Sequence, residues 1–170
     1  MDNFIRHRGW IVSANFTRPA NTTAYTSGDV VGPVTTPAAM VFIPGAEDKR
    51  DYAKIVSAVL ADSANVATKA DLELWLFEST LTPAADNEPF APTDAELRTL
   101  VGVIPFATGS FRVGDASSGA AGNAICESKN IQLAVQSQSA GGALYGVLVA
   151  RNAYVPVSGE RFDVRLAIED

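Results

Sequence analysis

The segment "RFDVRLAIE" (161–169) has the most regular pattern in the chain. Its large apolar side chains alternate with charged or small ones, and they are Phe162, Val164, Leu166 and Ile168. A period of two is typical of a strand that buries one side and exposes the other. The segment therefore predicts a half-buried β-strand near the end of the chain.

Two earlier segments extend this pattern. "NIQLAVQ" (130–136) alternates in the same way, with Ile131, Leu133 and Val135 directed inward. "LYGVLVA" (144–150) is apolar on both faces, which is typical of a central strand. Gly141-Gly142 lies between the two segments and predicts a hairpin-like connection.

The middle of the chain is more ambiguous. "DLELWLFES" (71–79) predicts a strand with leucines on one face and Trp75 and Phe77 on the other. We expect this aromatic pair to pack under a loop or against a subunit. "DYAKIVSAVLADS" (51–63) fits both a helical template and a strand buried on two faces, and its β-rich surroundings favour the strand.

Local signals predict one short helix and several turns. Thr93 with Glu96 three residues later forms a capping box. Pro105 confines the strand "VGVIPF" (101–106) to an edge or an end. Gly28 and Asp29 have the composition of a turn, and we see no further role for the loop around them.

These segments define the expected architecture. About eight strands and at most one short helix predict an all-β fold, an antiparallel jelly-roll-type β-sandwich. A length of 170 residues with 47% hydrophobic content suits one folded domain. We divide the chain into an N-terminal arm (1–15) and a single β-sandwich domain (16–170).

Charge and hydropathy exclude several classes of partner. The net charge of -6 argues against nucleic-acid binding. The longest weakly polar run, residues 140–150, is too short to span a membrane as a helix. Residues 1–20 hold Arg6, Arg8 and Arg18 against Asp2 alone, so a basic arm could dock on an acidic partner; a solvated terminus is the alternative.

The reactive side chains are few. Cys126 is the only cysteine and His7 the only histidine, so we expect no metal site, no cofactor and no catalytic residue of the Ser-His-Asp or Cys-His type. We expect the protein not to be an enzyme. A minor hydrolase built on two carboxylates stays open. The loop acids available for it, which we expect to form turns and aid solubility, are Asp62, Asp71, Asp86 and Glu88.

Four stretches in a fixed order carry a family resemblance. They are "RPANTTAYTSGDVVG" (18–32), "KIVSAVLADSA" (54–64), "LELWLFESTLTPAADNEPFAPTDAELRTLVGVIPF" (72–106) and "LYGVLVARNAYVP" (144–156). As an ordered set they resemble a family of tailed-bacteriophage virion proteins, the capsid decoration (cement) proteins and related head structural proteins. The resemblance implies a jelly-roll-type fold, a strand at 54–64 and no catalytic residue.

The resulting hypothesis is a non-enzymatic virion protein. It would be made in the cytoplasm of the bacterial host, bind the outer surface of the capsid and stabilise it. Its expected partner is the major capsid protein, and a homotrimer is the first expectation for its assembly. The candidate capsid-contact residues, all in the arm, are Phe4, Arg6, Arg8 and Trp10. Alternatively, Trp10 only begins the first core strand.

A hypothesis from another class is a carbohydrate-binding or host-adhesion module of a phage fibre. A jelly roll serves both roles, so the fold does not discriminate between them. Sugar binding needs exposed aromatic side chains gathered on one surface. The candidates are Trp75, Phe77, Tyr145 and Tyr154.

Overall fold

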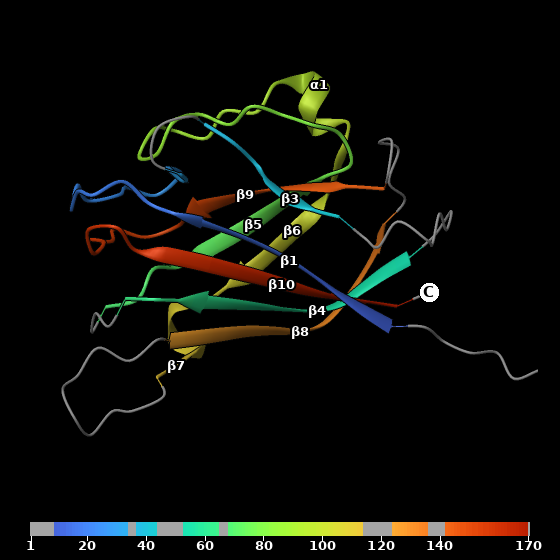
Figure 1. The fold of residues 1–170 in the computed structure, drawn as a ribbon. Coiled ribbons are helices and arrows are strands. Elements are labelled where there is room, and N and C mark those ends of the chain that lie inside the picture. Colours follow the sequence, from blue (N-terminus) through green and yellow to red (C-terminus); the bar gives the residue numbers. More distant parts are fainter. Residues whose placement is uncertain are drawn as a thin grey trace, which may run out of the picture.

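The computed structural model describes residues 9–33, 37–43, 53–64, 68–113, 124–135 and 142–169. These residues form two antiparallel sheets that pack face to face (Figure 1). The β10 sheet has the order β1 (Gly9–Thr17), β10 (Arg161–Glu169), β4 (Ala53–Asp62), β8 (Ala124–Val135) and β7 (Phe111–Val113). The β9 sheet has the order β2 (Val30–Val31), β9 (Leu144–Ala150), β5 (Leu72–Phe77) and β6 (Leu100–Phe106), and β3 (Met40–Phe42) also pairs with β9.

The antiparallel strand pairs are nested along the chain, each pair lying inside the previous one in sequence. This arrangement confirms the predicted jelly-roll-type sandwich. β1 pairs with β10, β3 with β9, β4 with β8 and β5 with β6. The chain therefore runs as one long doubled ribbon that reverses between β5 and β6 and rolls into two layers. The predicted hairpin at Gly141-Gly142 is wrong, because β8 and β9 belong to different sheets and their connection crosses between the layers.

The core lies between the sheets and follows the alternation in the sequence. The inner side chains of β10 are all buried, whereas Arg161 and Arg165 on its other face are exposed. β4 is a strand, as the resemblance implies, because β10 and β8 hydrogen-bond it on both sides. A bulge between Ile55 and Ser57 shifts its register, which accounts for the mixed periodicity of this segment.

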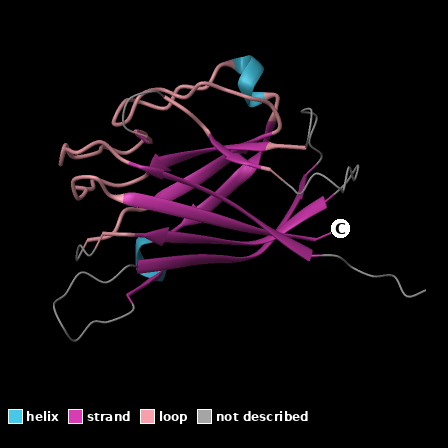
Figure 2. Ribbon diagram, viewed as in Figure 1, coloured by secondary structure: helices cyan, strands magenta, loops and turns pink. Residues whose placement is uncertain are grey.

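The segment between β5 and β6, residues 78–99, covers the outer face of the β9 sheet (Figure 2). Phe77 is fully buried there, and Trp75 packs edge-on against Phe90 with ring centroids 5.4 Å apart. This confirms that the aromatic pair packs under a loop. The segment contains α1 (Asp94–Leu97), whose predicted capping box between Thr93 and Glu96 is present.

The edges of the sandwich also follow from the sequence. β6 is the last strand of the β9 sheet, as Pro105 predicts. At the other side, β1 pairs with β10 along its whole length from Gly9 to Thr17. The boundary expected at residue 15 therefore falls inside β1.

Among the described residues no helix is long and apolar enough to cross a membrane.

Gly146 in β9 lies where side chains of the neighbouring strands β5 and β3 meet over the β9 sheet. A Cβ at this position would lie 2.9 Å from Leu74 Cδ1 and 2.9 Å from Phe42 Cε2. Both neighbours are fully buried, so they have no solvent to move into. We expect Gly146→Ala to lower the free energy of unfolding by about 1–3 kcal/mol in urea titrations.

Gly102→Ala is the matched control. The added Cβ would meet only the end of Leu133, 2.7 Å away, and Leu133 is partly exposed and can turn aside. The control should therefore lose clearly less stability. Equal losses for the two variants would contradict the tight packing of β9.

Candidate functional site

Three of the four predicted capsid-contact residues, Phe4, Arg6 and Arg8, lie outside the described residues. Trp10 lies in β1, on the same face as the buried Val12, and it packs against the core. Its indole N–H is buried and has no acceptor among the described residues. This placement is the one expected if Trp10 begins the first core strand.

Arg18 does not belong to a basic arm, which corrects the expectation drawn from residues 1–20. Its side chain is fully buried and forms an ion pair with Asp86, with Nη2 and Oδ2 3.1 Å apart. The guanidinium also lies over the ring of Tyr25, 4.7 Å from its centroid, and Nε donates to the Tyr25 hydroxyl. The charge of Arg18 is therefore neutralised inside the domain.

This ion pair holds three loops together. The hydroxyl of Tyr25 donates to Asp86 Oδ1, which also accepts the N–H of Gly32 at 3.0 Å. Arg18 Nη1 donates to the carbonyl of Val157 at 3.4 Å. The loop after β1, the segment after β5 and the loop before β10 thus meet at one end of the sandwich.

The predicted turn in the first of these loops is present. Gly28 has a φ of 103°, a conformation that favours glycine. Asp29 Oδ2 accepts the backbone N–H of Thr26 at 2.6 Å and its hydroxyl at 2.9 Å. The same loop carries Tyr25, so it also supplies a buried hydrogen-bonding group that the sequence did not reveal.

A second buried cluster adjoins the first. The rings of Tyr25 and Tyr154 are stacked, with centroids 6.3 Å apart and planes 7° apart. The Tyr154 hydroxyl donates to Glu160, whose carboxyl interacts with that of Asp62. Lys69 Nζ lies 2.9 Å from Asp62 Oδ2. We name the combined set the polar network; it comprises Arg18, Tyr25, Asp62, Lys69, Asp86, Tyr154 and Glu160.

Burial changes the titration of several of these groups. Loss of hydration, together with the hydrogen bond to Asp62, raises the pKa of Glu160 to about 8, so this carboxyl holds its proton at neutral pH. Burial first, and then the hydrogen bonds to Glu160 and Asp86, raise the pKa of Tyr154 and of Tyr25 above the usual range of a phenol. Burial also raises the pKa of the Cys126 thiol to about 11, so it is a poor nucleophile near neutral pH.

Asp62 and Asp86, two of the four acids considered for a hydrolase, lie in the polar network, where Asp62 is next to Glu160. Asp62 and Glu160 are each 2% exposed. Asp62 is also held by Lys69 and by the N–H of Ala64, 2.7 Å from Oδ1. The pair therefore fastens loops together in this conformation and presents no oxygen to a saccharide.

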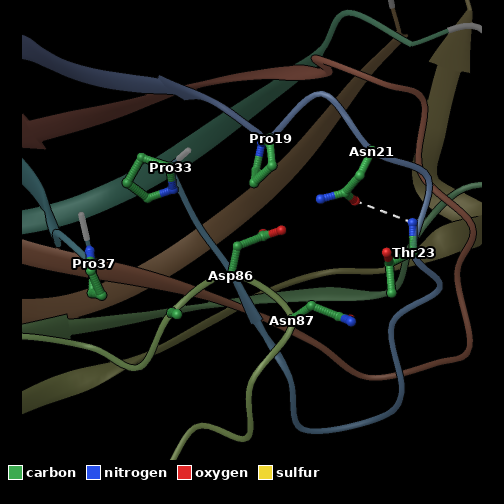
Figure 3. A pocket seen from close by; sticks show the side chains of 8 residues that line it. Pro19, Asn21, Thr23, Pro33, Pro37, Asp86 and Asn87 are labelled. Atoms are coloured by element: carbon green, nitrogen blue, oxygen red, sulfur yellow. Dashed lines mark hydrogen bonds between the residues drawn. The ribbon is translucent and has the colours of Figure 1, made fainter. Parts of the chain in front are cut away.

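A shallow pocket of about 310 Å³ opens beside the polar network (Figure 3). Asp86 and Asn87 form one wall, and Asn21 and Thr23 line the opposite side. The inner Asp86 oxygens already accept three donors, so this carboxylate serves the protein itself. Within the described parts of the chain, no group of His, Cys, Asp and Glu has the arrangement of a metal site.

The candidate sugar-binding aromatics are not gathered in the open. Phe77 is fully buried under Phe90, and Tyr154 is buried in the polar network. Trp75 is flanked by Phe90 and by Arg151, whose guanidinium lies 5.7 Å from the ring centroid. Arg151 therefore lies over one face of Trp75, and Trp75 and Tyr145 are both half-buried against the core under the segment 78–99.

Removing the charge of Asp86 should destabilise the domain strongly. In Asp86→Asn the buried Arg18 loses its counter-ion, and breaking a buried pair costs about 3–5 kcal/mol. Chemical denaturation of the variant measures this loss. The matched control is Asp163→Asn, which breaks an exposed pair with Arg161 and should cost less than about 1 kcal/mol. Similar losses in the two variants would contradict the role assigned to the buried pair.

Glu160 should make the stability depend on pH. Its pKa is about 8 in the folded protein against 4.5 for the ordinary carboxyl, so the folded state binds the proton more tightly. The contribution is full below pH 4.5 and is lost as the pH rises through 8. We expect the melting temperature to fall across this range, and to fall less steeply in Glu160→Gln, which is uncharged. Glu169→Gln, at an exposed position, should leave the slope of the wild type unchanged. Identical slopes in wild type and Glu160→Gln would contradict the assignment.

No family model matches the chain, and no curated protein matches it. Among solved structures, Desmodium yellow mottle tymovirus is 13% identical with a TM-score of 0.35, over 99% of this chain and 89% of that one. The BFDV capsid protein is 12% identical with a TM-score of 0.36, over 96% and 99%. The capsid structure of Helicobacter pylori bacteriophage KHP30 is 11% identical with a TM-score of 0.30, over 97% and 94%. TM-scores this low carry no argument about what this chain does.

Proposed function

We propose that this chain is a non-enzymatic structural protein of a bacteriophage virion that binds the outer surface of the capsid and stabilises it. The observation that carries the proposal is the placement of the carboxyl groups that could serve in catalysis: they are buried, and the exposed surface is left for contact. The buried carboxyls of Asp62, Asp86 and Glu160 interact with other protein groups inside the domain. The outside presents one broad sheet face, the outer face of the β10 sheet, which suits contact with other proteins. The ordered resemblance over 18–32, 54–64, 72–106 and 144–156 supports the same class.

The physical benefit of such a protein is additional contact area. A capsid encloses self-repelling DNA, so its subunits are pulled apart at their seams. A protein bound across a seam adds a contact of about 1,200–2,000 Å² in total, and the symmetry of the shell repeats it many times. In this proposal the partner is the major capsid protein and the chain assembles as a homotrimer near threefold positions.

The attachment element in this proposal is the segment 1–8, which directly precedes β1. It holds Phe4, Arg6 and Arg8, an apolar anchor and two arginines suited to carboxylates on the shell. Trp10 is left out of the contact set because it packs against the core. Since Gly9 already pairs with Glu169, the domain keeps its first strand when the segment is removed.

Electron microscopy of intact particles tests the function directly. We expect regularly spaced density for this chain on the outside of the heads of the virus that encodes it. Heads that lack the chain, or hydrolysis of a polysaccharide by the purified protein, would overturn the proposal.

Deletion of residues 1–8 tests the attachment. We expect the truncated chain to bind heads that lack the protein at least tenfold more weakly than the full chain, because it loses an anchor and two arginines. Co-sedimentation with such heads measures the affinity. Arg98→Gln removes one exposed positive charge from the segment 78–99 and serves as the control. Unchanged affinity after truncation would place the contact elsewhere on the domain.

A further inference from the structure

The outer face of the β10 sheet mixes apolar and charged side chains. Val59, Ala61 and Ala167 lie near its centre and are half-buried. Ile11 on β1 is 71% exposed, and Ile125 on β8 is 40% exposed. Apolar side chains in the middle of an open face, with charges around them, are the composition of a protein interface.

This face is basic although the protein is acidic. Strand register places five basic residues on it: Lys54, Arg112, Lys129, Arg161 and Arg165. The acidic residues on it are Glu127, Asp163 and Glu169. Its net charge is therefore +2, against -6 for the whole chain. We call it the basic face.

Arg165 is an exposed anchor near the middle of the basic face. By register its neighbours are Ser13 on β1 and Val59 on β4, neither of which is charged. Arg165 is exposed and forms no ion pair among the described residues. An arginine held on a rigid strand with an unused charge is a typical hot-spot residue.

The area of the basic face matches a specific interface. Five strands about 4.8 Å apart and about 25–30 Å long cover roughly 600–700 Å². A standard stable contact buries about 600–1,000 Å² on each partner, so the basic face lies at the lower end of that range. The basic face is therefore large enough to be one side of such a contact.

A complementary surface lies on the opposite side of the molecule. The segment 78–99 covers the outer face of the β9 sheet, away from the β10 sheet (Figure 1). Apart from Asp86, which Arg18 neutralises, its charged residues are Glu78, Glu88, Asp94, Glu96 and Arg98. Their net charge is -3. Leu97, 42% exposed, adds an apolar side chain. We call this segment the acidic cap.

We infer that copies of this chain associate head to tail, with the basic face of one copy on the acidic cap of the next. Opposite charges attract across the contact, and the apolar side chains on both surfaces are removed from water. Because the two surfaces differ and lie on opposite sides, the contact is heterologous. It extends into rows of copies and does not stop at a two-fold dimer.

This inference is independent of binding to a shell through residues 1–8, because it concerns contacts between copies whether or not a shell is present. It replaces the homotrimer of the proposed function, since a contact between opposite sides extends into rows and does not close into a trimer. It gives a reason for the charge separation that attachment through residues 1–8 does not. Copies bound side by side on a surface would reinforce each other through the same contact. Experiments on particles therefore test the proposed function, and experiments on the purified chain test the association, so either one can be contradicted without the other.

Sedimentation velocity of the purified full chain tests the association. At low salt, roughly 0.05 M, we expect the weight-average mass to rise with protein concentration beyond that of a dimer. At roughly 0.5 M salt the charges are screened and the chain should be mainly monomeric. Arg165→Glu and, separately, Glu88→Lys should each weaken association about tenfold or more. Val155→Glu, at an exposed loop position away from both surfaces, is the control and should leave it unchanged.

Mixing the two charge variants tests the direction of the contact. Arg165→Glu keeps an intact acidic cap, and Glu88→Lys keeps an intact basic face. In an equimolar mixture the two intact surfaces bind each other and the two reversed charges are again opposite in sign, so the mixture should associate although each variant alone does so only weakly. The proposal is overturned if the wild type stays monomeric at low salt, if either variant associates like the wild type, or if the mixture does not associate. Unfolding curves for each variant show whether the domain is intact.

Discussion

The antiparallel ladder between β1 and β10 is the constraint on which the rest of the structure depends. It joins the first described strand to the last, residue by residue from Gly9–Glu169 to Thr17–Arg161. The other three pairs are nested inside it, so the β10 sheet is complete only when nearly the whole chain is in place. Such a fold depends on contacts between distant residues, which makes folding slow relative to helical domains of similar size.

The same ladder positions the polar network. Arg18 follows the last residue of β1 and Glu160 precedes the first residue of β10, and their backbones are joined by a hydrogen bond of 2.8 Å. Arg18 and Glu160, one from each half of the polar network, are therefore side by side where β1 ends and β10 begins. Burying this many polar and charged groups is unfavourable unless each has its partner. Since Arg18 is satisfied only when three loops meet, the network favours one arrangement of those loops over others.

Elements whose signal is local were predictable from the sequence. The alternation in 161–169, the capping box at Thr93 and the edge position of Pro105 each depend on a few neighbouring residues, and the structure has all three. The hairpin at Gly141-Gly142 was not predictable in this way. A pair of glycines permits a turn, but whether the next strand stays in the same sheet depends on which distant strands pair first.

The polar network was missed for the same reason. Asp62 and Asp86 have the flanking residues of ordinary loop acids, and Glu160 follows a Ser-Gly turn. Asp86 is held by contacts over more than 60 residues of sequence, with Arg18 and Tyr25, whereas Asp62 and Glu160 also bind partners six or seven residues away. A single sequence without alignment shows no trace of such pairs. The one available signal is Arg18 itself, because it stands three residues before the polar loop that carries Tyr25.

The distribution of charge connects the interior to the surface. Arg18 and Lys69 form ion pairs with buried carboxylates. The basic residues that lie on strands are mostly on the outer face of the β10 sheet. Strands hold their side chains at fixed spacing and in fixed directions, whereas the acidic cap lies on a segment packed over the opposite sheet. The rolled ribbon thus separates charges that are mixed along the sequence into two opposed surfaces. In both proposals a jelly roll with its buried carboxyls satisfied internally and its charge divided in this way would bind through its faces.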